Sequence, residues 1–171
     1  MHAACHYTVS TRHPSHHFFQ VTLTILQPDP LGQKLWLPNW IHGSYMIRDF
    51  SRHIISVSPK TTEGLLLSVK KIAKNQWSVS PYEGEIIISY EVYAWDLSVR
   101  GAHLDQTHCY FNGSCLFLAV EGQEDNLSTL EIHLPTQHQS WRIATTLDTL
   151  PSHQTGVYHY QAANYLTLLD H

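Results

Sequence analysis

Apolar and polar side chains alternate without a break in Phe19-Gln20-Val21-Thr22-Leu23-Thr24-Ile25. This period of two is typical of a β-strand, in which successive side chains point to opposite faces. We therefore expect a strand that is buried on one face only. Its core face would carry Phe19, Val21, Leu23 and Ile25, and its outer face would carry Gln20, Thr22 and Thr24.

Short β-branched or aromatic runs continue along the rest of the chain, and turn formers such as Glu83-Gly84 and Glu121-Gly122 separate them. We expect further strands at Lys34–Leu37, Ile54–Ser58, Leu65–Val69, Gln76–Ser80, Glu85–Trp95, Cys115–Val120, Thr129–Leu134, Trp141–Thr145 and Val157–Tyr160. Many short strands predict a mainly β fold, either an antiparallel β-sandwich or a saddle-like open β domain. Only the tail, Ala162–His171, has apolar residues at helical steps of three and four, so it predicts a short C-terminal helix.

Length and composition limit the class of protein. The chain has 171 residues with 43% hydrophobic content, which suits one domain over residues 1–171. A net charge of -4 without a basic run gives no phosphate-binding surface, so we expect no nucleic-acid partner. The longest apolar run, Cys115–Val120, cannot cross a membrane, and three cysteines without a C-x-x-C pair favour a reducing, cytoplasmic setting.

Histidine is abundant, with 14 in the chain, so metal binding has to be considered. The pairs His103 with His108 and His133 with His138 are each five residues apart. That spacing puts the rings on different sides of a regular strand or helix, so a shared metal would need an irregular loop. The group His13, His16 and His17 beside Pro14 is typical of an exposed loop. No pair of histidines four apart encloses the glutamate of a zinc peptidase, so we expect no metal site and no catalytic residue in this chain.

A cysteine nucleophile is a weaker alternative. Cys109 could be paired with His103 or His108 as base and Asn112 as orienting residue, but a buried structural thiol explains the same residue.

Two dense stretches contain the candidate binding residues. Leu35–Phe50 reads LWLPNWIHGSYMIRDF, and Tyr93–Phe117 reads YAWDLSVRGAHLDQTHCYFNGSCLF. The first could be a fixed loop that presents Tyr45, Arg48 or Asp49 to a partner, or a plain strand, turn and hydrophobic anchor. In the second, Asn112-Gly113 is a strong turn signal.

These two stretches resemble the N-terminal domain of the glycyl aminopeptidase-like metallopeptidases, whose pattern reads approximately LWLPNWIPGSYMIRDF and YEVYAWDLSVRxAHLDxTHxFFNG. His42 stands where that family has proline. The resemblance implies a parent protein in which this domain precedes a thermolysin-like zinc domain carrying HExxH, with a PDZ-like domain beyond. The parent would remove small N-terminal residues such as glycine from peptides.

On this resemblance the fragment itself is not an enzyme and has no cofactor, and its partner is the downstream catalytic domain. The candidates for a substrate-cleft or interdomain contact are Tyr45, Arg48, Asp49, Asn112 and Gly113. We expect exposed apolar surface at Gly43–Phe50 and Tyr110–Ser114, which a homodimer could also cover.

A different hypothesis is a free-standing binding module that stacks exposed tryptophans on peptide or carbohydrate, with Trp36, Trp40, Trp77 and Trp95 as candidates. Burial of these tryptophans would favour the domain of a larger peptidase.

Overall fold

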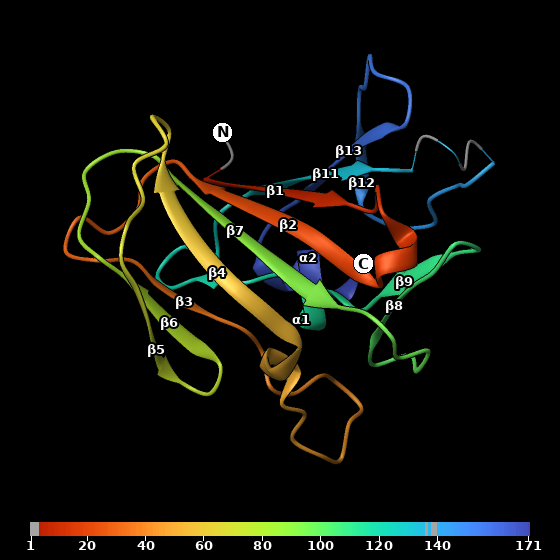
Figure 1. Cartoon of the computed structure of the whole chain (residues 1–171), viewed down its shortest axis with the longest axis horizontal. Helices are drawn as coiled ribbons and strands as arrows, with labels where there is room; N and C mark the ends of the chain where they lie inside the picture. Colours follow the sequence, from red (N-terminus) through yellow and green to blue (C-terminus); the bar gives the residue numbers. More distant parts are fainter. Residues whose placement is uncertain (1–3, 136, 138–139) are drawn as a thin grey trace.

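A large, mainly antiparallel sheet organises the protein in the computed structural model, which describes residues 4–135, 137 and 140–171 (Figure 1). Its seven strands lie in the order β12-β13-β11-β1-β2-β7-β4, and β1 and β11 form its parallel pair. Their bounds are β1 Cys5–Ser10, β2 Phe18–Ile25, β4 Ile54–Thr61, β7 Ile86–Tyr93, β11 Ser128–His133, β12 Asp148–Leu150 and β13 Val157–Ala162.

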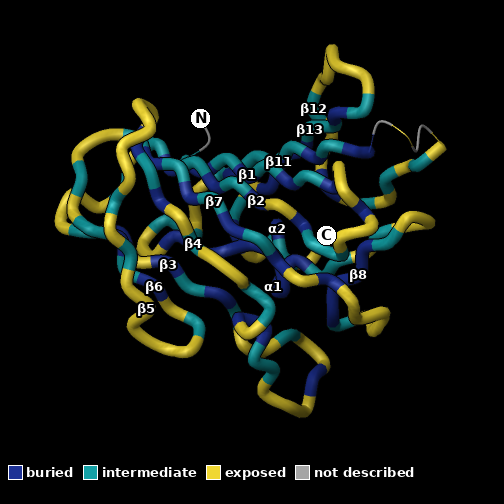
Figure 2. Tube along the Cα trace, viewed as in Figure 1, coloured by how far each residue is buried: buried dark blue, intermediate teal, exposed yellow. Residues whose placement is uncertain are grey.

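The alternation that predicts β2 is confirmed. Phe19, Val21, Leu23 and Ile25 are all at most 1% exposed and belong to the core. Gln20, Thr22 and Thr24 face the other side and are exposed or half-buried. Figure 2 shows the same change of burial along the neighbouring strands. One face of the large sheet therefore carries the core, and the other is polar.

Smaller elements cover the core face. A four-stranded sheet has the order β10-β3-β6-β5, and a separate hairpin joins β8 to β9. The bounds are β3 Lys34–Trp36, β5 Val69–Ala73, β6 Gln76–Val79, β8 Ala102–Leu104, β9 Cys109–Phe111 and β10 Ala119–Val120. The helices are α1 Gly113–Leu116 and α2 Tyr165–Asp170, with 3-10 turns η1 Pro14–His16 and η2 Phe50–His53. Both α-helices lie beneath the middle strands of the large sheet (Figure 1).

The predicted fold class is confirmed, because the chain is mainly β, open rather than closed into a barrel, and ends in a short helix. Three predicted strands are wrong in whole or part. Trp141–Thr145 contains no strand, Leu65–Val69 is replaced by a strand that begins at Val69, and Cys115–Val120 begins inside α1. Among the described residues, no helix is long and apolar enough to cross a membrane.

Candidate functional site

The loop between β3 and η2 presents apolar side chains to solvent. Tyr45 is 102% exposed, Met46 is 63% exposed and Ile47 is 67% exposed. Internal hydrogen bonds hold the loop in place: the Trp40 indole Nε1 donates to the carbonyl of Ser44 at 2.8 Å, and Ser44 is itself buried. These exposed side chains therefore stand on an ordered loop, as a contact surface requires.

A second loop, between β7 and β8, is exposed in a similar way. Trp95, Leu97 and Val99 are 53%, 67% and 69% exposed. The Asp96 carboxylate accepts a hydrogen bond from the Ser98 backbone N–H at 2.8 Å, which closes the loop on itself. We call the exposed side chains Tyr45–Ile47 together with Trp95, Leu97 and Val99 the loop-pair surface.

A cavity of 360 Å³ lies between these two loops. Its lining includes three arginines and two aspartates, namely Arg48, Arg52, Arg100, Asp49 and Asp96. Cys115 forms part of the wall, and burial raises the pKa of its thiol to about 12. The site is thus a polar pocket next to apolar side chains, which is the mixture found at ligand sites and interdomain clefts.

Two of the five sequence candidates, Arg48 and Asp49, line this pocket. The Arg48 Nε donates to the Ser44 hydroxyl at 3.3 Å. Asp49 forms an exposed ion pair with Lys74 at 3.2 Å. Tyr45 lines neither this pocket nor the larger one and points to solvent. The pocket also includes Asp96 and Arg100, which stand in the second dense stretch of the sequence but were not among the candidates.

The other two candidates, Asn112 and Gly113, line a different and larger cavity of 680 Å³, bordered by β9, residues 140–147 and the end of α2. The Asn112 side-chain oxygen accepts from the Ser114 backbone N–H at 3.0 Å and so caps α1. Gly113 lies against the backbone of Leu169. Local structure alone accounts for both residues.

The expected apolar surface at Gly43–Phe50 is present, whereas most of Tyr110–Ser114 is not exposed: Tyr110 is 40% exposed, and Gly113 and Ser114 are buried. The loop after β7 supplies the second exposed segment instead.

The tryptophans give a divided result. Trp77 is 5% exposed and Trp36 is half-buried, but Trp40 is 43% exposed. The exposed Trp95 ring packs between two histidine rings of the same chain, 4.0 Å from His17 and 4.8 Å from His103 between ring centroids. The Trp95 ring thus already contacts aromatic rings of its own chain, which leaves less of the ring available to stack on a ligand.

The structure does not favour a cysteine nucleophile. Burial raises the pKa of the Cys109 thiol to about 11, so the thiol stays protonated at neutral pH. A reactive cysteine requires a lowered pKa.

The hairpin of β8 and β9 brings His103 and His108 together. The Asp105 backbone N–H bonds to the His108 carbonyl at 3.0 Å across the turn, and the two imidazole rings lie 5.1 Å apart between centroids. Asp105 contacts both rings, at 3.0 Å from His103 Nε2 and 3.5 Å from His108 Nδ1. The five-residue spacing therefore does not separate these rings, because a tight turn lies between them. In the second pair, His138 lies outside the described residues.

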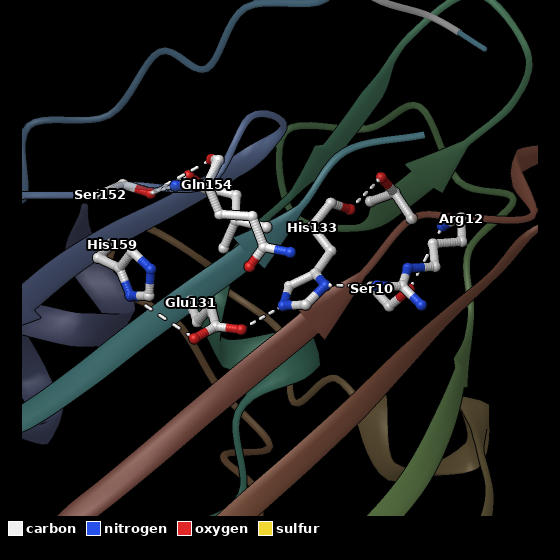
Figure 3. A network of polar contacts seen from close by, with 9 residues as sticks. Ser10, Arg12, Glu131, His133, Ser152, Gln154 and His159 are labelled. Carbon is white, nitrogen blue, oxygen red and sulfur yellow. Dashed lines mark hydrogen bonds and ion pairs between the residues drawn. The ribbon is translucent and has the colours of Figure 1, made fainter. Parts of the chain in front are cut away.

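A further histidine network lies on the polar face of the large sheet (Figure 3). The Glu131 carboxylate contacts His133 with one oxygen and His159 with the other, at 3.6 Å for the latter. Arg12 bonds to the second ring nitrogen of His133 at 3.1 Å. The network ties β11 to β13 and to the end of β1 at the surface, where such contacts contribute little to stability.

The comparisons with known proteins agree with this architecture. The family described as the peptidase M61 N-terminal domain matches residues 6–171. A crystal structure of an aminopeptidase N family protein from Idiomarina loihiensis is similar, with a TM-score of 0.90 and 43% identity over 97% of this chain and 28% of that chain. An M1 zinc metallopeptidase from Deinococcus radiodurans is far less similar, with a TM-score of 0.42 and 14% identity over 92% of this chain and 36% of that chain. No curated protein matches.

Proposed function

Because the chain belongs to the family of peptidase M61 N-terminal domains, we propose that it is the non-catalytic leading domain of a zinc aminopeptidase that releases small N-terminal residues such as glycine. The family match over residues 6–171 carries this proposal. The Idiomarina relative supports it, since this chain spans 28% of that protein and the remainder has room for a catalytic domain.

The loop-pair surface is the part of the domain that packs on the catalytic domain. Aromatic and long aliphatic side chains gain the most from leaving water, and Tyr45, Met46 and Ile47 expose theirs fully or largely. The pocket beside them would form one polar wall of the substrate cleft. Its charged side chains of both signs, among them Arg48, Arg100, Asp49 and Asp96, could hold both the amine and the carbonyl groups of a peptide.

On this proposal the chain by itself does not hydrolyse peptides. We expect the purified chain to release no detectable product from a chromogenic glycine anilide, because the zinc-peptidase histidine pair and its glutamate are missing from the sequence. Activity that copurifies with the chain through two columns would contradict the assignment.

The contact surface is tested by Tyr45→Ala in the complete parent enzyme. We expect kcat/KM to fall by at least about tenfold. A tyrosine that is exposed in the isolated domain and becomes buried at an interface often contributes about 2 kcal/mol or more to the free energy of binding. The Tm of the isolated chain should hardly change, since surface substitutions usually cost less than about 0.5 kcal/mol. Arg48→Ala should behave in the same way through the pocket.

Leu31→Ala is the matched control, because Leu31 is also apolar and 87% exposed but lies in the loop between β2 and β3. Its removal should leave both the enzyme and the isolated chain unchanged. If Tyr45→Ala left the complete enzyme as active as Leu31→Ala, or destabilised both proteins equally, the proposed contact would be wrong.

The exposure of Trp40 and Trp95 favours a second candidate, a free-standing module that binds peptide or carbohydrate. The two functions differ in what the isolated chain does. Saturable quenching of tryptophan fluorescence by short peptides or oligosaccharides, lost in Trp40→Ala, would favour the module.

A further inference from the structure

The turn of the β8–β9 hairpin places three metal-ligating side chains on one side of the chain. His103 lies on β8 and Asp105 follows directly after its end, with its carboxylate 3.0 Å from the His103 ring. His108 lies directly across the turn from Asp105. Among the described residues, His103, Asp105 and His108 form the one group of three in which all the ligand atoms lie within 4.8 Å of one another.

We propose that His103, Asp105 and His108 bind a divalent transition-metal ion, with Zn²⁺ as the reference ion. Two imidazole nitrogens and one carboxylate oxygen are a donor set that suits Zn²⁺ and its neighbours in the first transition row. The proposal is independent of the peptidase function, because it concerns only residues of this hairpin.

The distances between these side chains are close to what such a site needs. In a tetrahedral zinc site with bonds of about 2.0–2.1 Å, neighbouring ligand atoms lie roughly 3.3 Å apart. Asp105 Oδ2 lies 3.0 Å from His103 Nε2, and Asp105 Oδ1 lies 3.5 Å from His108 Nδ1. Only the His108 ring has to move appreciably toward His103, and its side chain is 53% exposed and free of core packing.

The Asp105 carboxylate is already oriented for this role. Its Oδ1 accepts hydrogen bonds from the Thr107 backbone N–H at 2.7 Å, the Thr107 hydroxyl at 2.6 Å and the His108 backbone N–H at 3.0 Å. Its Oδ2 faces His103 and is not used in the turn. A ligand carboxylate with one oxygen fixed by hydrogen bonds and the other directed at the site is the usual supporting arrangement around bound metals.

A second observation concerns the His103 ring, which is 3% exposed. Its Nε2 contacts Asp105, but its Nδ1 is buried and has no hydrogen-bond partner among the described residues. Burial holds the ring in place, and Nε2 is the nitrogen that faces Asp105 and would bind the metal. The Trp95 ring packs 4.8 Å from the same imidazole and limits its movement. His103 therefore behaves as a fixed ligand, and His108 as the mobile one.

The test is a zinc titration of the 171-residue chain against a chromophoric chelator, with removal of the mobile ligand by His108→Ala. We expect the unaltered chain to take up one equivalent of Zn²⁺. His108→Ala should weaken that binding at least about tenfold, because even the loss of a supporting residue costs that much. Circular dichroism should show the same fold in both, since His108 is half-exposed, and His108→Gln offers a substitute if the alanine variant aggregates.

The control is the double variant His13→Ala with His16→Ala, because these exposed rings stack 5.4 Å apart at η1, outside the β8–β9 hairpin. This double variant should bind one equivalent of Zn²⁺ with the affinity of the unaltered chain. No uptake of Zn²⁺ would overturn the proposal. So would equal affinity in His108→Ala, or loss of the single equivalent in the His13 and His16 variant.

Discussion

Tyr90→Phe is expected to lower the free energy of unfolding by about 3 kcal/mol, although it removes only one oxygen atom and Tyr90 lines neither cavity. Tyr90 lies on β7 and is 2% exposed. Its hydroxyl donates to the Leu116 carbonyl at 2.9 Å and accepts from the Leu118 backbone N–H at 3.2 Å. Phenylalanine would leave both backbone groups buried and unpaired, and each such group costs about 1–3 kcal/mol.

The reason lies in the segment that runs from the last residue of α1 to the start of β10. Leu116, Phe117 and Leu118 are at most 1% exposed, so their backbone crosses the core without a sheet ladder to pair it. Three buried tyrosine hydroxyls donate hydrogen bonds to the backbone carbonyls of these residues. Tyr90 donates to Leu116, Tyr165 to Phe117 at 2.7 Å and Tyr7 to Leu118 at 2.7 Å. Burial raises the pKa of all three tyrosines, so each hydroxyl keeps its proton and remains a donor.

Urea denaturation of matched tyrosine-to-phenylalanine variants measures this effect. Tyr7→Phe loses only one carbonyl partner and should cost about 1–2 kcal/mol. Tyr93→Phe, on the same strand as Tyr90 but 39% exposed, should change stability by less than about 0.5 kcal/mol. If Tyr90→Phe fell within the range of Tyr93→Phe, the hydroxyl would not be pairing these backbone groups.

This segment also explains why one strand prediction is wrong. Cys115–Val120 is a continuous apolar run, and such a run does not distinguish a buried strand from a buried helix turn. What decides it is the pairing of its backbone by Tyr7, Tyr90 and Tyr165, which come from three distant parts of the chain. The regular strands are different. In β2 apolar and polar residues alternate along the chain, so the local sequence alone predicts the strand and its buried face.

The strand β1 is the opposite case, a regular strand that the local sequence did not predict. Cys5, Tyr7 and Val9 alternate with polar residues and are all at most 2% exposed, but none of the predicted strands covers them. Cysteine and tyrosine are weaker apolar signals than the leucine and isoleucine of β2. Its parallel partner β11 also begins 123 residues later, with Cys5 opposite Ser128, so no turn signal connects the two.

The candidate site was only partly predictable for a related reason. The sequence placed Arg48 and Asp49 in an unusual loop, and the structure puts both at one pocket. Asp96 and Arg100 also line this pocket, because the loop after β7 meets the loop after β3 in space. The local sequence pattern does not predict that contact. The spacing of His103 and His108 separates two rings only in a regular strand or helix, and here a turn lies between them.

Gly113→Ala is the second large effect, expected at about 2–3 kcal/mol of lost stability. A Cβ at Gly113 would lie 2.7 Å from the Cα of Leu169, 2.9 Å from the Leu169 carbonyl oxygen and 3.0 Å from the Leu168 carbonyl oxygen. These are backbone atoms, so no side chain can rotate away. Instead α2 has to move off α1, and Leu168, which is 2% exposed, would lose part of its packing.

The neighbouring Asn112→Ala provides the comparison, because it removes the cap of α1 without adding an atom against α2 and should cost about 1 kcal/mol. In thermal unfolding, Gly113→Ala should therefore have a lower Tm than Asn112→Ala, and both variants should have a lower Tm than the unaltered chain. The complete enzyme should show the same order, since a clash between α1 and α2 acts within the domain. If Gly113→Ala instead kept the Tm of the isolated chain and lowered only the kcat/KM of the complete enzyme, Gly113 would be needed at the cleft rather than for the packing of the two helices.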